Sequence, residues 1–317
     1  MKKFPLFRHG KRYRPLSQHY QERFGKKVYK VSVSVADSCP NRESKNNMSV
    51  CVFCDEWGSA AYHQYSDHPI KKQIQINREA IRKRYRAEKF LIYFQSYTNT
   101  FGRINELENL YKIALKEQDV VGLVIGTRPD CLPKKILKKF EEIARNYYLS
   151  VELGIQTLNN DQLNFLSRGH DSVCSIKAIH KLKKLSDINL CVHLIFGLPK
   201  ETDRQIRQTA EILSALNVDG VKLHNLHVLR NTPLEVMYQN SQFVPIDLEE
   251  YSHKVALFLE NLSPKITVHR LSAVASRWDE LVAPQWTKEK MRSTQYIEDY
   301  LSSKDTWQGR MFFDNKN

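Results

Sequence analysis

Short runs rich in apolar and β-branched residues alternate along the chain with longer segments in which apolar residues recur every three or four positions. The longer segments include 71–87, 105–116, 134–147, 172–185 and 202–216, and their spacing predicts amphipathic helices. The apolar runs predict strands, and they cover 28–35, 90–94, 120–125, 149–153, 189–196, 220–228 and 266–270. Regular alternation of strand and helix is typical of parallel βαβ units, so the predicted fold class is α/β.

Polar residues gather where the predicted strands end. Cys39 follows the first strand, residues 95–100 the second, residues 127–130 the third and Gln156 the fourth. The strands lack the Gly-rich fingerprint of a dinucleotide-binding fold, so we expect a partial TIM-type (β/α)6 barrel with this polar rim as its active face. The chain then divides into a basic N-terminal arm (1–26), the partial barrel (27–245) and a C-terminal helical extension (246–317) that completes one side of the barrel.

The cysteines suggest a metal site rather than disulfides. The chain has six cysteines, and Cys39, Cys51 and Cys54 lie within sixteen positions of one another. No run approaches the ~20 apolar residues of a membrane span, and the N-terminal segment has no signal-peptide core. We therefore expect a cytoplasmic protein, whose reducing surroundings favour metal-binding over disulfide-forming cysteines.

Two metal sites fit this cysteine spacing. Cys39, Cys51 and Cys54 come from one loop, and thiolates are the ligands of iron–sulfur clusters. Three ligands for four irons would leave one iron open to a further ligand. The alternative is zinc, held by the same cysteines with His63 or His68, because a two-residue gap between cysteines also suits tetrahedral zinc.

Motifs outside the cysteine loop resemble one known superfamily. Asp37-Ser38-Cys39-Pro40-Asn41-Arg42 and Cys51-Val52-Phe53-Cys54 are similar to the cluster loops of radical S-adenosylmethionine (SAM) enzymes. Segments 126–130, 152–156 and 168–170 resemble the radical SAM core of the elongator catalytic subunit, in the same order. Segments 20–35, 93–100, 222–227 and 306–309 resemble the YhcC/YtqA-like bacterial radical SAM family, a resemblance that spans almost the whole chain.

The resemblance implies a 4Fe–4S cluster on Cys39, Cys51 and Cys54, with SAM bound beside it. Reductive cleavage of SAM would then start hydrogen abstraction from the substrate, with the electron supplied by a reductant such as flavodoxin or ferredoxin. Gln156 and Arg168 would flank SAM, and the Arg168 guanidinium would reach its carboxylate. The other implied cofactor-binding residues are Phe53 beside the adenine and, at the ribose or amino group, Glu152, Ser96, Tyr97, Thr98 and Asn99.

The elongator resemblance implies tRNA as the partner, with the C5 substituent of its wobble uridine as the target. The resemblance to the YhcC/YtqA-like family implies remodelling of that side chain from carboxymethylaminomethyl toward aminomethyl. A formal net charge of +14 agrees with a polyanionic partner. Basic residues of the arm, with Tyr13 and Tyr20, would hold phosphates and stack on bases, or else form a solvated charged surface. Lys222, His224 and His227 are the candidate catalytic residues, for binding a substrate carboxylate or moving a proton.

Two alternatives stay open at this point. A radical SAM enzyme acting on a small molecule or peptide would share the cofactor residues but would not bind RNA. A zinc-dependent nucleic-acid-binding protein without catalysis would share the cysteines but would leave Gln156 and Arg168 without a role. The oligomeric state is not predicted.

Overall fold

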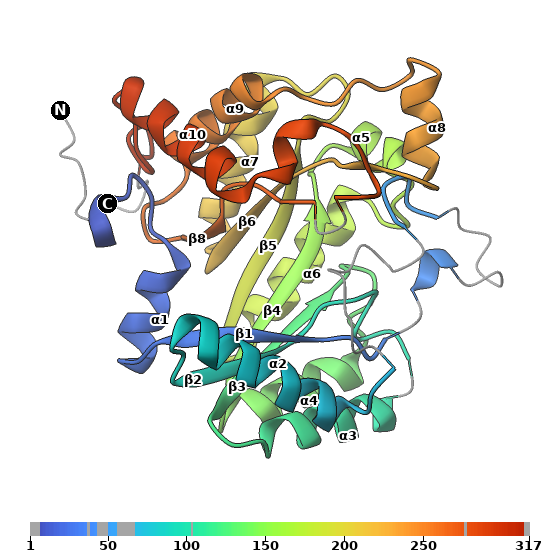
Figure 1. Ribbon diagram of the computed structural model, residues 1–317, viewed down its shortest axis with the longest axis vertical. Helices are drawn as coiled ribbons and strands as arrows, with labels where there is room; N and C mark the ends of the chain where they lie inside the picture. Colours follow the sequence, from blue (N-terminus) through green and yellow to red (C-terminus); the bar gives the residue numbers. More distant parts are fainter. Residues whose placement is uncertain are drawn as a thin grey trace.

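The predicted strands pair into one parallel sheet whose spatial order follows the chain. In the computed structural model the order is β1-β2-β3-β4-β5-β6-β8, so β1 and β8 are the two edges of the sheet. The strands are β1 (Val28–Val33), β2 (Lys89–Phe94), β3 (Val120–Thr127), β4 (Tyr148–Gln156), β5 (Ile188–Phe196), β6 (Gly220–Asn225) and β8 (Thr267–Arg270). The sheet curls into a half-barrel (Figure 1), which confirms the predicted α/β partial barrel. The structure describes residues 7–36, 39–42, 50–55, 67–102, 104–275 and 278–313.

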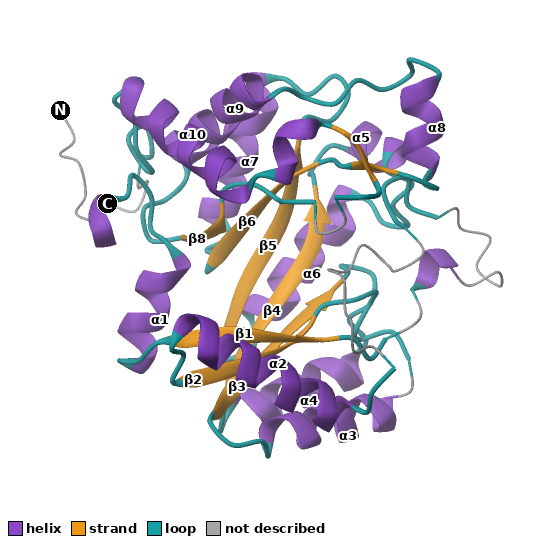
Figure 2. Cartoon of the chain, viewed as in Figure 1, coloured by secondary structure: helices purple, strands orange, loops and turns teal. Residues whose placement is uncertain are grey.

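Helices on the outer side of the sheet connect successive strands (Figure 2). Each buries one apolar face against the sheet, as Phe140 and Ile136 of α4 do with no exposed surface. Side-chain caps fix several of their N-termini, including a capping box between Thr202 and Gln205. These helices are α2 (Ile70–Tyr85), α3 (Ile104–Leu115), α4 (Lys134–Ala144), α6 (Ser172–Lys183), α7 (Asp203–Ala215) and α9 (Leu248–Asn261).

Shorter elements complete the fold around the carboxyl ends of the strands and at the chain ends. A two-stranded antiparallel ribbon pairs β7 (Val228–Leu229) with β9 (Leu281–Ala283). The remaining elements are the helices α1 (Leu16–Phe24), α5 (Asn160–Phe165), α8 (Pro233–Gln239) and α10 (Lys290–Ser303), and the short 3-10 helices η1 (Arg8–Gly10), η2 (Pro40–Arg42) and η4 (Gln285–Lys288).

The N-terminal segment packs against the edges of the half-barrel. Helix α1 contacts both β1 and β8, and Pro15 forms a bridge with Val268. Ahead of α1, Lys11 Nζ and Tyr13 Oη lie 2.5 and 3.0 Å from the carboxylate of Glu298 in α10. The expectation that the tyrosines of this segment stack on bases is wrong, because Tyr13 and Tyr20 are buried in the apolar core.

None of the helices formed by the described residues is both long enough and apolar enough to cross a membrane.

Candidate functional site

A cavity of about 290 Å³ opens inside the half-barrel at the carboxyl ends of the strands. This is the rim at which the sequence placed the chemistry, because parallel strands all end on the same side. The predicted site residues that line it are Cys39, Cys51, Phe53, Cys54, Tyr97, Thr98, Glu152, Gln156, Arg168, Lys222, His224 and His227. Chain segments almost two hundred residues apart therefore meet in one site.

Two predicted cofactor-binding residues shape the rim without lining the cavity. Ser96 and Asn99 have no exposed surface. The Asn99 side chain donates to the carbonyl oxygens of Phe94 and Ser96 at 3.0 and 2.9 Å, and the hydroxyl groups of Ser96 and Ser34 are 2.6 Å apart. These contacts hold the turn that presents their neighbours Tyr97 and Thr98 to the cavity.

Each predicted cysteine ligand has an arginine beside its sulfur atom. A neighbouring guanidinium stabilises a thiolate, which is the form that binds iron. Three thiols and three guanidinium groups at one end of a cavity thus fit the donor set and charge of an iron–sulfur cluster. The nitrogen–sulfur distances are 3.3 Å for Arg128 and Cys39, 3.5 Å for Arg168 and Cys51, and 3.3 Å for Arg42 and Cys54.

Of the two histidines of the zinc alternative, only His68 lies within the described residues. His68 is not among the residues that line the cavity. His63 lies outside the described residues, as do Asp37 and Ser38 of the first motif.

An irregular turn at the end of β4 brings Gln156 and Arg168 together. The pairing of β4 with β5 shifts register between Gly154 and Gln156, and Gln156 takes a positive φ of 67°. A Cβ atom at Gly154 would lie 2.8 Å from Gln156 Nε2, so a larger residue there would displace the end of that side chain. Arg168 Nη2 donates to the Gly154 carbonyl oxygen at 3.1 Å, which fixes the guanidinium beside Gln156.

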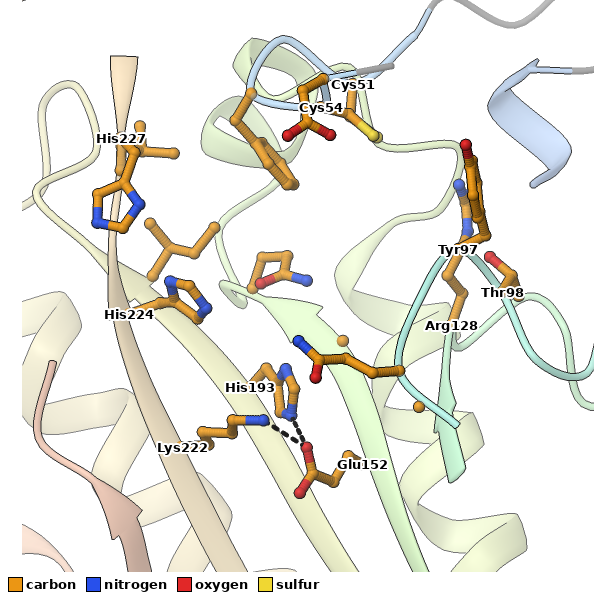
Figure 3. Close-up of a pocket in the computed structure, with 18 of the residues that line it drawn as sticks. Cys51, Cys54, Tyr97, Thr98, Arg128, Glu152, His193, Lys222, His224 and His227 are labelled. Carbon is orange, nitrogen blue, oxygen red and sulfur yellow. Dashed lines mark hydrogen bonds and ion pairs between the residues drawn. The ribbon is translucent and has the colours of Figure 1, made fainter. Parts of the chain in front are cut away.

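Deeper in the half-barrel, a buried carboxylate holds a network of cations and hydrogen-bond donors. Glu152 Oε2 lies 2.6 Å from Lys222 Nζ, 2.8 Å from His193 Nε2 and 2.6 Å from the Tyr93 hydroxyl. Its other oxygen accepts a hydrogen bond from Lys30. Figure 3 shows Glu152, Lys222 and His193 at the opposite end of the cavity from Cys51 and Cys54.

Burial and mutual charge set the protonation states of this network. Burial would raise the pKa of Glu152, but the charges of Lys222 and Lys30 bring it well below its usual range. Burial lowers the pKa of Lys222 to about 8, although Glu152 opposes the change. Burial and the charge of Lys222 lower the pKa of His193 to about 4, so its imidazole is neutral near pH 7. The network therefore contains one permanent anion and a lysine that titrates close to neutrality.

His224 and His227 stand at the carboxyl end of β6, with ring centroids 6.3 Å apart. Burial and the charge of Arg270 lower the pKa of His224 well below its usual range and that of His227 to about 4. Both rings are neutral near pH 7, so each has one unprotonated ring nitrogen that can accept a hydrogen bond.

Glu152 and Lys222 were predicted as site residues, but their neighbours Lys30 and Arg270 were not. His193, Lys222 and Arg270 are neighbours in the register of β5, β6 and β8, while Lys30 reaches Glu152 from β1. The available signal was a charged or imidazole side chain inside an otherwise apolar strand, since such groups are rarely buried without partners.

Comparisons with known proteins agree with this geometry. Residues 33–213 match the family model described as the Radical SAM superfamily, and residues 218–303 match the Radical_SAM C-terminal domain. The protein YtqA of Bacillus subtilis is 32% identical over 309 residues, which are 98% of this chain and 95% of YtqA. This match confirms the resemblance to the YhcC/YtqA-like family.

Two other similarities cover less of the related proteins. A tRNA uridine(34) acetyltransferase of Methanocaldococcus jannaschii is 30% identical over 165 residues, 51% of this chain and 30% of that protein. The solved structure of Elp3 from Methanocaldococcus infernus superposes with a TM-score of 0.68 at 19% identity, covering 89% of this chain and 64% of that one. This second likeness concerns the fold alone.

The family model that spans 33–213 covers more than half of the chain and includes the three cysteines of the cavity. The cofactors of this family are a 4Fe–4S cluster and SAM. The chain belongs to the radical SAM superfamily.

Proposed function

We propose that this radical SAM enzyme modifies the C5 side chain of the wobble uridine of a tRNA, from carboxymethylaminomethyl toward aminomethyl. The methylene carbon of the carboxymethyl group would lose a hydrogen atom and one electron to give an imine, and water would cleave the imine to the amine and glyoxylate. SAM, converted to methionine and 5'-deoxyadenosine, is the net two-electron oxidant. The observation that carries the proposal is the similarity, over half of the chain, to a protein named for its action on tRNA uridine 34. The net charge of +14 supports a polyanionic substrate.

At the rim, Cys39, Cys51 and Cys54 would hold the cluster. When bound, the cluster and SAM supply reductive cleavage of SAM and hydrogen-atom abstraction. Arg168 and Gln156 would flank SAM, with the guanidinium at its carboxylate. Phe53, Tyr97 and Thr98 would form the wall around the adenosine, while Ser96 and Asn99 keep that wall in shape.

Deeper in the cavity, the chain's own residues would control protons. Lys222 has a pKa of about 8 and lies 3.0 Å from the Tyr93 hydroxyl, so it can donate or accept a proton near neutrality. Glu152 would hold Lys222 in place, and the sequence-based assignment of Glu152 to SAM stays a prediction. His224 and His227, neutral near pH 7, would accept hydrogen bonds from the substrate amine.

Phosphate contacts of the tRNA would fall to the exposed residues Arg23, Lys26 and Lys27 at the end of α1. Farther upstream, Lys11 is already paired with Glu298 and Arg14 with Glu22. The reaction needs SAM, tRNA and a reductant such as flavodoxin or ferredoxin together, and the cytoplasm offers all three.

Nucleoside analysis of tRNA tests the proposal. Anaerobically reconstituted protein is incubated with SAM, a reductant and tRNA that carries carboxymethylaminomethyluridine, and the nucleosides are then identified by mass spectrometry. We expect this nucleoside to decrease and aminomethyluridine to appear, and neither change with the Cys54→Ala variant. Cleavage of SAM with an unchanged nucleoside profile would contradict the tRNA assignment and favour a small-molecule or peptide substrate.

A further inference from the structure

Three residues on the cavity wall carry buried nitrogen atoms that the protein leaves unpaired. Asn225, His227 and Arg270 all line the cavity. Within the described part of the chain, Asn225 Nδ2, His227 Nε2 and Arg270 Nη2 are buried and have no hydrogen-bond partner. Buried polar atoms are nearly always paired in folded proteins, so three exceptions on one wall indicate a missing ligand.

The sheet and short hydrogen bonds hold these groups in place. Arg270 is the register neighbour of Lys222 in β6, and its Nε donates to the Leu223 carbonyl oxygen at 3.2 Å. Asn225 Oδ1 accepts a hydrogen bond from the Ala273 backbone at 3.1 Å. This contact fixes the orientation of the amide and leaves its NH2 group unpaired.

The charges around these nitrogens favour an anionic ligand. Lys30, Lys222 and Arg270 bring three positive charges, and the first two share the carboxylate of Glu152. No carboxylate among the described residues forms an ion pair with Arg270. His224 and His227 are neutral near pH 7 and do not offset the excess. A buried guanidinium without a counter-ion is unfavourable unless a ligand supplies the negative charge.

We infer that Arg270 and Asn225 form a subsite for the carboxylate of the substrate, an inference that rests on the proposed function. The unprotonated His227 Nε2 would face the adjoining amine as a hydrogen-bond acceptor. A carboxylate accepts hydrogen bonds at both oxygens and pairs well with a guanidinium. The carboxymethylaminomethyl group ends in such a carboxylate, whereas its aminomethyl product has none. The subsite therefore distinguishes substrate from product and favours release of the product.

Arg270 and Asn225, rather than Lys222, would then recognise the substrate carboxylate. Lys222 Nζ is already engaged by Glu152 and by the Tyr93 hydroxyl, so it stays with the proton network. SAM also has a carboxylate, and binding tests have to separate it from that of the substrate.

The test measures binding to reconstituted, SAM-loaded protein by calorimetry. The probes are 5-carboxymethylaminomethyluridine, its methyl ester and N-benzylglycine, which has the same carboxymethylamino end without the uridine. The variants are Arg270→Gln and Asn225→Asp. Asn225→Asp keeps the acceptor for the Ala273 backbone but places a negative charge beside Arg270, and Arg230→Gln, at an exposed position, is the matched control.

We expect the wild type and Arg230→Gln to bind the acid at least about tenfold more tightly than the ester, as charge-assisted hydrogen bonds require. Arg270→Gln and Asn225→Asp should lose this preference while their cluster content and SAM affinity stay unchanged. If N-benzylglycine bound in an Arg270-dependent manner but no uridine probe did, the carboxylate subsite would stand and only the proposed uridine substrate would be contradicted.

Two results would overturn the subsite. The first is that both variants keep the preference for the acid over the ester, or that the wild type shows no such preference with any probe. The second is a loss of SAM affinity in Arg270→Gln, which would assign Arg270 to the carboxylate of SAM.

Discussion

Lys222 of β6 and Glu152 of β4 form an ion pair inside the half-barrel, with 2.6 Å between Nζ and Oε2 and no exposed surface on the carboxylate. The two strands are separated by β5, whose His193 contacts the same oxygen. Glu152, His193 and Lys222 together connect three neighbouring strands beside the cavity. The same contacts therefore contribute both to the stability of the barrel and to the chemistry of the site.

We predict that Glu152→Gln lowers the free energy of unfolding by about 3–5 kcal/mol, because it leaves the buried Lys222 and the half-buried Lys30 without their counter-ion. Urea denaturation of the two proteins at pH 7 measures this difference. Glu79→Gln is the control, since Glu79 forms an exposed ion pair with Arg82. This substitution should lower the free energy of unfolding by less than about 1 kcal/mol. An equal loss of unfolding free energy in both variants would show that the buried network stabilises the fold no more than an exposed ion pair does.

The contribution of Glu152 should also depend on pH. Its pKa in the folded protein lies well below the usual value of 4.5, so the unfolded chain takes up a proton first as the pH falls. The stability that Glu152 provides is then fully present above pH 4.5 and is lost progressively below it. Denaturation of wild type and Glu152→Gln between pH 7 and pH 3 checks this, and a difference in stability that grows toward acid would be the opposite of the expected trend.

Lys222 should titrate at an unusually low pH. We expect one lysine resonance in an NMR titration of 13C-labelled protein to shift with a midpoint near 8, and Lys222→Arg to remove it. In Glu152→Gln the midpoint should fall further, because the carboxylate favours the charged form. A midpoint for Lys222 near the usual 10.5 would rule out its proposed role in proton transfer.

Arg168→Gln should weaken SAM binding by about tenfold or more, through loss of a charge-assisted contact with the SAM carboxylate. Equilibrium dialysis with labelled SAM measures the affinity, and the iron content of the same samples shows whether the cluster is retained. Arg145→Gln, at an exposed position after α4, is the control. Unchanged SAM affinity in Arg168→Gln would leave this residue with its contacts to Gly154, Cys51 and His170 but no role at SAM.

The sequence predicted the fold because its signals are local. Alternating strand and helix patterns specify parallel βαβ units, and polar residues at strand ends mark the rim of the half-barrel. The N-terminal segment was harder to interpret. Its basic character suggested an open arm, but Tyr13 and Tyr20 are buried by contacts with residues far away in the chain, which no local pattern reports.

Within the site, the cysteines, Gln156 and Arg168 could be predicted from the sequence because they lie in short segments that resemble motifs of the radical SAM superfamily. The Glu152 network could not, because it depends on which strands become neighbours and at what register. Arg270 reaches its place beside Lys222 through the pairing of β6 with β8. Similarly, Ser96 and Asn99 differ from Tyr97 and Thr98 only in the direction that the turn gives each side chain.

Iron and acid-labile sulfide content, measured on anaerobically reconstituted protein together with the spin-resonance spectrum, tests most directly whether this cavity holds the cluster. We expect about four irons per chain in the wild type and a spectral change on adding SAM. Cys51→Ala should lose both, while Cys174→Ala, a cysteine of α6 outside the cavity, should keep both. Full iron content with an unchanged SAM response in Cys51→Ala would contradict the assignment of the cysteines and of the cofactor site built on them.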